Sequence, residues 1–175
     1  MAPARILVIE DDETIRQLAV TVLALEGYDV LAARDAEAGR AMVDEFQPDV
    51  VLMDRQLPGM DGLTLTRILK ADPRTWRITV LAFSGNDARE NDMEAVSAGC
   101  DGFLAKPVDV TALLRTVAWH VAVRRSRFGP RSSVSTKYDA APFRRPLGAA
   151  QSRAAHVLPA IVRVERPFNP VSETL

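Results

Sequence analysis

Short apolar runs alternate with longer amphipathic segments along the first 125 residues of the chain. The apolar runs are typical of strands buried on both faces, and the intervening segments carry apolar residues at helical spacing. The expected strands cover residues 6–9, 28–33, 50–53, 78–83 and 102–105. The expected helices cover about residues 15–23, 35–46, 63–70, 87–98 and 110–125. Repeated strand–helix units of this length predict an α/β fold, with a parallel sheet covered by helices on both faces.

The charge of the chain changes sign near residue 124. Residues 1–123 hold 12 basic and 20 acidic side chains, a net charge of −8, whereas residues 124–175 hold 10 and 3, a net charge of +7. The second part also contains 6 of the 11 prolines. We therefore predict one folded domain over residues 1–125 and a basic, proline-rich, largely disordered extension over residues 126–175.

Composition excludes several classes of protein. The single cysteine, Cys100, rules out an internal disulfide and a cysteine metal cluster, and two histidines are too few for a histidine-rich metal site. No apolar stretch approaches the roughly 20 residues that a membrane-spanning helix needs. We expect a cytoplasmic protein without a membrane span.

Polar residues follow four of the five expected strands. Glu10 and Asp11 follow the first strand, Asp54 the third, Ser84 the fourth and Lys106 the fifth. An acid after one strand usually does no more than end that strand in water. The carboxyl ends of parallel strands share one edge of a sheet, where open α/β proteins bind ligands, so the coincidence predicts a site.

The residue types in this set suit phosphoryl chemistry. Clustered carboxylates without histidine or cysteine favour Mg²⁺ as the bound cation. Lys106 offers a point positive charge to a phosphoryl oxygen, and Ser84 offers a hydroxyl donor. An aspartate in such a site can itself be the nucleophile.

The sequence resembles the receiver domain of two-component response regulators over about residues 4–123. Five segments in order carry the resemblance: ILVIEDD at 6–12, VLMD at 51–54, LPGMDG at 57–62, FSG at 83–85 and DGFLAKP at 101–107. The resemblance implies a doubly wound, flavodoxin-like (βα)5 fold with a five-stranded parallel sheet in the order 2-1-3-4-5. It also implies a stand-alone receiver with a C-terminal extension.

Roles at the acidic edge follow from the same resemblance. Asp54 matches the phosphoacceptor and Asp11 the direct Mg²⁺ ligand, whereas Glu10 matches the acid that acts through water. The backbone carbonyl of Gln56 matches a further metal ligand. Lys106 matches the lysine that pairs with the phosphoryl group, and its bond to Pro107 resembles the family's cis peptide.

Three further positions match the residues through which receivers respond to phosphorylation. Ser84 matches the residue that senses the phosphoryl group, and Phe103 matches the aromatic side chain that turns inward on activation. Gln56 and Asn86 lie where family members tune the lifetime of the phosphoryl group.

The resulting hypothesis is a signalling switch in a phosphorelay, and not an enzyme acting on a separate substrate. A histidine kinase or a histidine phosphotransfer protein would supply the phosphoryl group with Mg²⁺ present. The protein would catalyse its own phosphorylation and slow autodephosphorylation. A downstream protein would bind the face made by the fourth helix, fifth strand and fifth helix.

Other functions remain as alternatives. A transcriptional or nucleic-acid-binding regulator could act through the basic extension, although its prolines leave little room for a DNA-binding helical domain. A Mg²⁺-dependent phosphatase would need an acid two residues after its nucleophile, where this chain has Gln56. A pseudo-receiver is disfavoured because the set Glu10, Asp11, Asp54, Ser84 and Lys106 is intact.

Overall fold

The structure is a computed structural model that describes residues 2–84 and 88–129. Within these ranges the side chains of residue 84 and of residues 88–92 are not described. The expected tuning position Asn86 and the extension from residue 130 onward therefore lie outside the described residues.

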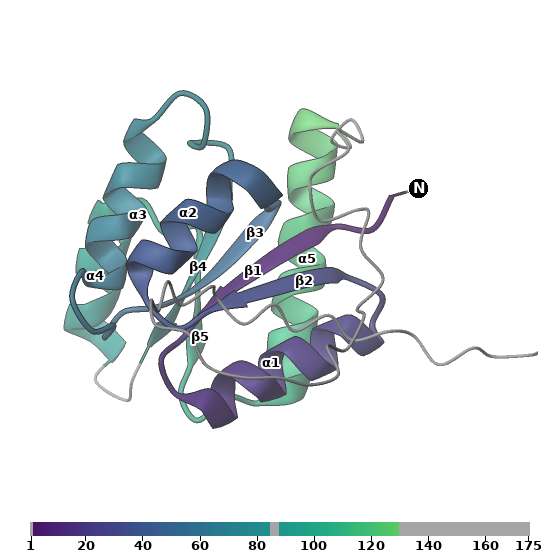
Figure 1. The fold of residues 1–175 in the computed structure, drawn as a ribbon, viewed down its shortest axis with the longest axis horizontal. Coiled ribbons are helices and arrows are strands. Elements are labelled where there is room, and N and C mark those ends of the chain that lie inside the picture. Colours follow the sequence, from purple (N-terminus) through teal and green to yellow (C-terminus); the bar gives the residue numbers. More distant parts are fainter. Residues whose placement is uncertain (1, 85–87, 130–175) are drawn as a thin grey trace, which may run out of the picture.

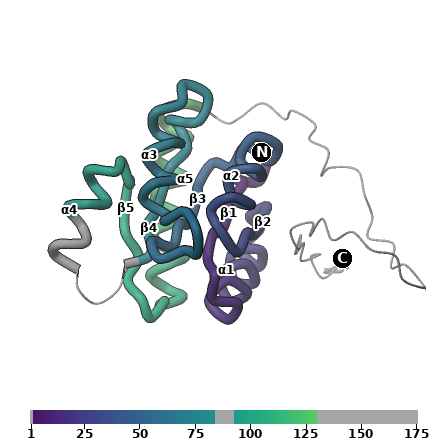
Figure 2. The backbone as a smooth tube through the Cα atoms, turned by 60° about the vertical axis from the view of Figure 1, so that its left-hand side comes forward, coloured from purple at the N-terminus to yellow at the C-terminus, as the bar shows by residue number. Residues whose placement is uncertain are grey.

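Five strands form one parallel sheet, as the sequence predicts. They are β1 (Arg5–Ile9), β2 (Asp29–Ala33), β3 (Val50–Asp54), β4 (Thr79–Ser84) and β5 (Gly102–Ala105). Each neighbouring pair is parallel, and the order across the sheet is β2-β1-β3-β4-β5, which Figure 2 shows from right to left. This confirms the doubly wound topology with its reversal of strand order between β1 and β3.

A helix follows each strand. The five are α1 (Glu13–Leu25), α2 (Ala36–Phe46), α3 (Gly62–Ala71), α4 (Ala88–Ala98) and α5 (Val110–Phe128). Four of these helices begin directly after an aspartate, namely Asp12, Asp35, Asp61 and Asp109. The carboxylate of each aspartate accepts a hydrogen bond from the backbone N–H three residues on, a donor that the first turn leaves free. No helix in residues 2–84 and 88–129 is long and apolar enough to span a bilayer.

The strands bury alternate residues on opposite faces, which gives two hydrophobic cores. Ile6 and Val8 pack in the core under α1 and α5, and Leu7 and Ile9 pack in the core under α2 and α3 (Figure 1). A third, smaller cluster joins α3 to α4. The sheet is thus buried on both faces, which explains the continuous apolar runs.

The last helix extends beyond its expected end. We expected α5 to stop at Arg125, but it continues to Phe128. The Phe128 ring packs edge-on against Trp76, with ring centroids 5.9 Å apart, and the Arg77 guanidinium lies over both rings. These contacts hold the added turn to the α3–β4 loop, an interaction between distant segments that helical periodicity does not reveal.

Candidate functional site

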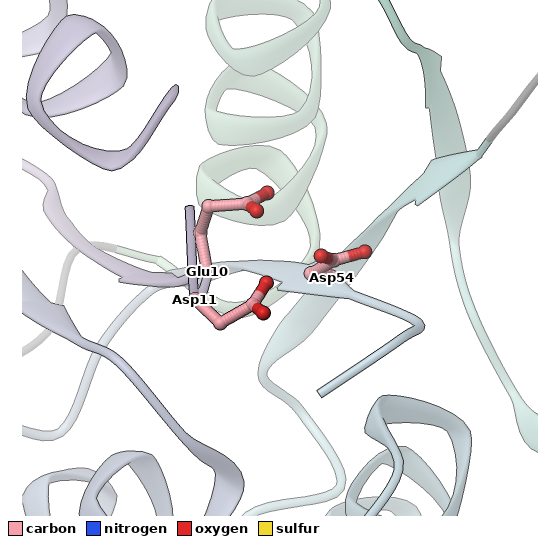
Figure 3. A group of neighbouring side chains, drawn as sticks. All are labelled: Glu10, Asp11 and Asp54. Carbon is pink, nitrogen blue, oxygen red and sulfur yellow. The ribbon is translucent and has the colours of Figure 1, made fainter. Parts of the chain in front are cut away.

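Three carboxylates from two adjacent strands meet at the carboxyl edge of the sheet. Glu10 and Asp11 follow β1, and Asp54 ends β3, whose pairing with β1 brings the two strand ends side by side. Figure 3 shows the three side chains pointing toward a common space. One oxygen from each carboxylate lies within 4.8 Å of the others, and Glu10 and Asp54 are buried while Asp11 is exposed.

Lys106 reaches this cluster from the end of β5. Its Nζ lies 2.8 Å from Oδ2 of Asp54 and 3.0 Å from Oε2 of Glu10, so one ammonium group pairs with both buried acids. Its side chain also passes over the Phe83 ring of the intervening strand, with Nζ 5.7 Å from the centroid. The Lys106–Pro107 bond is cis, as the resemblance implied.

The arrangement shifts the pKa values of both Glu10 and Lys106. The pKa of Glu10 is raised to about 7, because burial and the Asp54 charge, which both raise it, together outweigh the hydrogen bond from Lys106, which lowers it. Burial lowers the pKa of Lys106, but hydrogen bonds to Asp54 and Glu10 outweigh that effect, and its pKa is raised overall. The edge therefore holds more negative charge than one ammonium group neutralises.

The start of α3 packs directly against the Asp54 backbone. A Cβ on Gly62 would clash with the Asp54 carbonyl oxygen, so only glycine allows this approach. Gly62 N–H donates to the Arg55 carbonyl at 3.0 Å, and Asp61 caps the helix. Gly62 lies in the segment LPGMDG that carries the resemblance, but its contact with the preceding strand has no local sequence signal.

Arg16 of α1 holds the loop that carries the first two acids. Its Nη1 donates to the Glu10 carbonyl at 2.7 Å and to the Asp11 carbonyl at 3.0 Å. Sequence reasoning missed this residue, since one arginine on the polar side of a helix resembles any solvated charge.

The loop after Asp54 makes two contacts that bear on the site. The Gln56 N–H donates to Oδ1 of Asp54 at 3.3 Å, and the Gln56 side chain is exposed. Arg55 pairs with Glu94 of α4, with Nη2 and Oε2 3.2 Å apart. The charge directly after Asp54 thus links the loop to α4.

The structure places the other expected residues less completely. The Ser84 backbone ends β4 and pairs with Ala105, but its side chain lies outside the description. Phe103 is half-buried and packs against the cluster of Leu63, Ala95 and Ala98 between α3 and α4. Phe103 therefore lies beside α4, so a movement of that helix would alter the packing of the Phe103 ring.

The donor set fits a hard divalent cation. The three residues offer carboxylate oxygens alone, and Mg²⁺ binds through one or two carboxylates while keeping several waters. Among the described residues, Oε2 of Glu10 is buried and has no hydrogen-bond donor, although it lies within ion-pair distance of Lys106. A further cation would relieve the excess negative charge at this edge.

The fold and the site together define a doubly wound α/β protein with an acidic, lysine-bearing site at its topological switch point. The family model described as the response regulator receiver domain matches residues 6–118, and the chain belongs to this family. Two-component signalling is thereby its functional context.

Known relatives share the receiver but differ in total length. The chain is 37% identical over 113 residues to the DNA-binding dual master transcriptional regulator RpaA of Synechocystis, which covers 65% of this chain and 47% of RpaA. It is 39% identical over 114 residues to response regulator PleD of Caulobacter vibrioides, covering 65% of this chain and 25% of PleD. The chain thus spans about half and a quarter of the length of these two relatives.

A solved structure agrees with the fold. The chemotaxis response regulator CheY4 of Vibrio cholerae superposes with a TM-score of 0.65 at 25% sequence identity. The match covers 67% of this chain and 98% of that one.

Proposed function

We propose that Asp54 accepts a phosphoryl group from the phosphohistidine of a histidine kinase or a histidine phosphotransfer protein. The observation that carries the proposal is the contact of Asp54 with Lys106 inside a carboxylate cluster at the switch point of the sheet. An Asp54 carboxylate oxygen forms a bond to phosphorus as the bond from phosphorus to the histidine nitrogen breaks. The imidazole leaves and regains a proton from water.

The neighbouring side chains divide the remaining work. Lys106 pairs with Asp54 before transfer, and its ammonium group then hydrogen-bonds an oxygen of the transferred group. Asp11, Asp54 and the Gln56 carbonyl would hold Mg²⁺, with Glu10 acting through water. When bound, Mg²⁺ supplies positive charge that offsets the carboxylates and the incoming phosphoryl oxygens.

The phosphorylated state is proposed to change the face made by α4, β5 and α5. Ser84 would hydrogen-bond the phosphoryl group and Phe103 would turn inward, while Asn86 and Gln56 would set the phosphoryl lifetime. The large apolar side chains Met93 and Val96 of α4 are exposed, at 75% and 61%, which supports a partner-binding surface there. Modification would bias an existing equilibrium between two conformations.

The domain organisation is part of this proposal. We place the receiver at the start of the chain and end it with α5, and we propose that the basic extension is largely disordered. The near-complete coverage of CheY4 supports a receiver that folds without further domains. We expect the protein to act in the cytoplasm, where its kinase partner presents the phosphohistidine.

Intact-mass spectrometry with a small phosphodonor tests the proposal. Incubation of the full chain with acetyl phosphate and Mg²⁺ should add the mass of one phosphoryl group, and Asp54→Asn should abolish the addition. The matched control is Asp12→Asn, an exposed acid of the same loop that should still be labelled. Equal labelling of Asp54→Asn and wild type would exclude Asp54 as the acceptor.

A further inference from the structure

A hollow lies at the opposite end of the sheet from the carboxylates. It is a groove of about 420 Å³ between the α3–β4 loop and the second half of α5. It is lined by Thr79, the first residue of β4, and by Asp101, the residue before β5. The groove therefore lies at the amino ends of the strands. In Figure 1 this region lies at the top, near the end of α5. Its volume is in the range of small-molecule pockets.

The groove is cationic within an acidic domain. Four basic side chains and one carboxylate line it, although residues 1–123 carry a net charge of −8. Lys70 is neutralised by Asp101 at 2.7 Å and Arg124 by Asp49 at 2.7 Å. The other two basic residues, Arg77 and Arg127, are exposed, and the Arg77 guanidinium lies over the Trp76 and Phe128 rings. This local excess of positive charge favours an anionic ligand.

The walls of the groove carry flat aromatic surfaces. Trp76 on the loop and Trp119 on α5 line it from two separate elements, and they are 45% and 60% exposed. They are the two tryptophans of the chain. The Trp76 ring already contacts Arg77 and Phe128, so Trp119 offers the more exposed indole for a planar ring that stacks, and the arginines can bind an attached anion.

A buried donor lining the groove has no partner. Arg124 is 5% exposed, and its Nε has no hydrogen-bond acceptor among the described residues, although its Nη1 pairs with Asp49. A buried N–H group without an acceptor costs free energy, roughly 1–3 kcal/mol.

We propose that this groove binds a purine nucleotide, with the base against Trp119 and the phosphates on Arg77 and Arg127. A nucleotide supplies the ring and the anion in one molecule of suitable size. An acidic peptide would supply the charge but would extend beyond a single hollow of this volume. The site is separate from Asp54, so the proposal does not depend on phosphorylation.

Tryptophan fluorescence of the full chain tests the proposal directly, because both indoles line the groove. The probes are ADP and GDP, titrated without Mg²⁺, with adenosine as the ring alone and pyrophosphate as the anion alone. We expect saturable quenching by ADP or GDP, with adenosine and pyrophosphate each binding at least about tenfold more weakly. Amide NMR shifts should fall within residues 76–79 and 119–128.

Matched arginine variants complete the test. Arg127→Gln should weaken nucleotide binding about tenfold or more, because a charged hydrogen bond is lost, without lowering the melting temperature of this exposed position. Arg115→Gln, an exposed arginine of α5 outside the groove, should bind as wild type does. Absence of saturable quenching, pyrophosphate binding as tight as ADP binding, or unchanged binding in Arg127→Gln would each overturn the proposal.

Discussion

Lys106 is the residue on which the electrostatics of the site depend. Its ammonium group pairs with Asp54 and Glu10 at once, and both acids are buried. Phosphorylation of Asp54 would bring a phosphoryl oxygen to Nζ of Lys106 as a third partner. Lys106 would then exchange contacts without leaving the site. We therefore propose that its contribution is larger in phosphoryl transfer than in folding.

Replacing Lys106 tests this assignment. Lys106→Ala should slow phosphorylation by acetyl phosphate about 100-fold or more, because a charged donor to the transferred group is lost. The measurement is the time course of phosphoryl incorporation by intact mass. Lys70→Ala is the matched control, since Lys70 lies at the other end of the domain and pairs with Asp101. Equal rates in Lys106→Ala and wild type, with both proteins folded by circular dichroism, would contradict the role.

Individual residues show why the sequence predicts one part of the site and not another. Glu10, Asp54 and Lys106 could be found because each stands at the end of a recognisable strand, and parallel strands bring those ends together. Arg16 and Gly62 act through backbone contacts across the fold. Such contacts depend on tertiary packing and leave no local pattern.

At the scale of elements, the junction of β3 and α3 fixes the position of Asp54. Gly62→Ala should destabilise the domain by about 2–4 kcal/mol, because the added Cβ would meet the Asp54 carbonyl, which cannot move aside. Urea unfolding gives the change. Gly39→Ala is the comparison, because its Cβ would meet side-chain atoms of Ile9 and not backbone. A Gly62→Ala cost no greater than that of Gly39→Ala would contradict this close approach.

Helix α5 carries a buried histidine that makes stability depend on pH. His120 is nine-tenths buried, and burial lowers its pKa below the usual 6.5, with the charge of Asp101 opposing the shift. Lys70, paired with Asp101, and Arg124, one turn further on, are the other charged groups that line this region. Below about pH 6.5 the unfolded chain takes up a proton that the folded chain resists, so stability falls with acidification.

Replacing this histidine should remove that part of the pH dependence. The free energy of unfolding of wild type should fall relative to His120→Leu as the pH drops from about 7.5 to 5.5, by at most about 1.4 kcal/mol per pH unit. Urea unfolding at several pH values provides the comparison, and His156 is present in both proteins. A constant difference, or one of opposite slope, would show that His120 does not titrate in this way.

The sequence predicts the elements well and their ends less well. The α2 and α5 starts could be predicted because the aspartate caps Asp35 and Asp109 precede them, whereas α1 begins at Glu13, two residues before its expected start. The end of α5 was placed three residues early because the packing of Phe128 on Trp76 involves a loop some 50 positions away. Contacts across the fold, and not helix propensity, decide where this helix stops.

At the scale of the whole molecule, the folded domain is proposed to end with α5. A chain cut after Gly129 should keep its melting temperature within about 2 °C. A cut after Ser126 should lower the melting temperature by about 3–6 °C, because it removes Phe128 and with it the contacts with Trp76 and Arg77. Differential scanning calorimetry of both chains provides the measurement. A large loss of stability after the first cut would show that residues 130–175 belong to the folded unit.

The two ends of the sheet carry opposite charge and different chemistry. The carboxyl edge gathers three acids around one lysine, and the amino edge gathers arginines and both tryptophans. The acidic edge is the site of the proposed phosphorylation, whereas the cationic groove is available to a different ligand. One small domain can thus hold two independent sites.

The central claim is that the phosphoryl group resides on Asp54, and chemical mapping of the acyl phosphate tests it most directly. Wild-type protein phosphorylated with acetyl phosphate is reduced with borohydride, which converts the phosphorylated aspartate to homoserine, and is then digested for tandem mass spectrometry. Homoserine should appear at position 54. Homoserine at position 11, 12 or 61 instead, or none in protein that has gained the phosphoryl mass, would contradict the account.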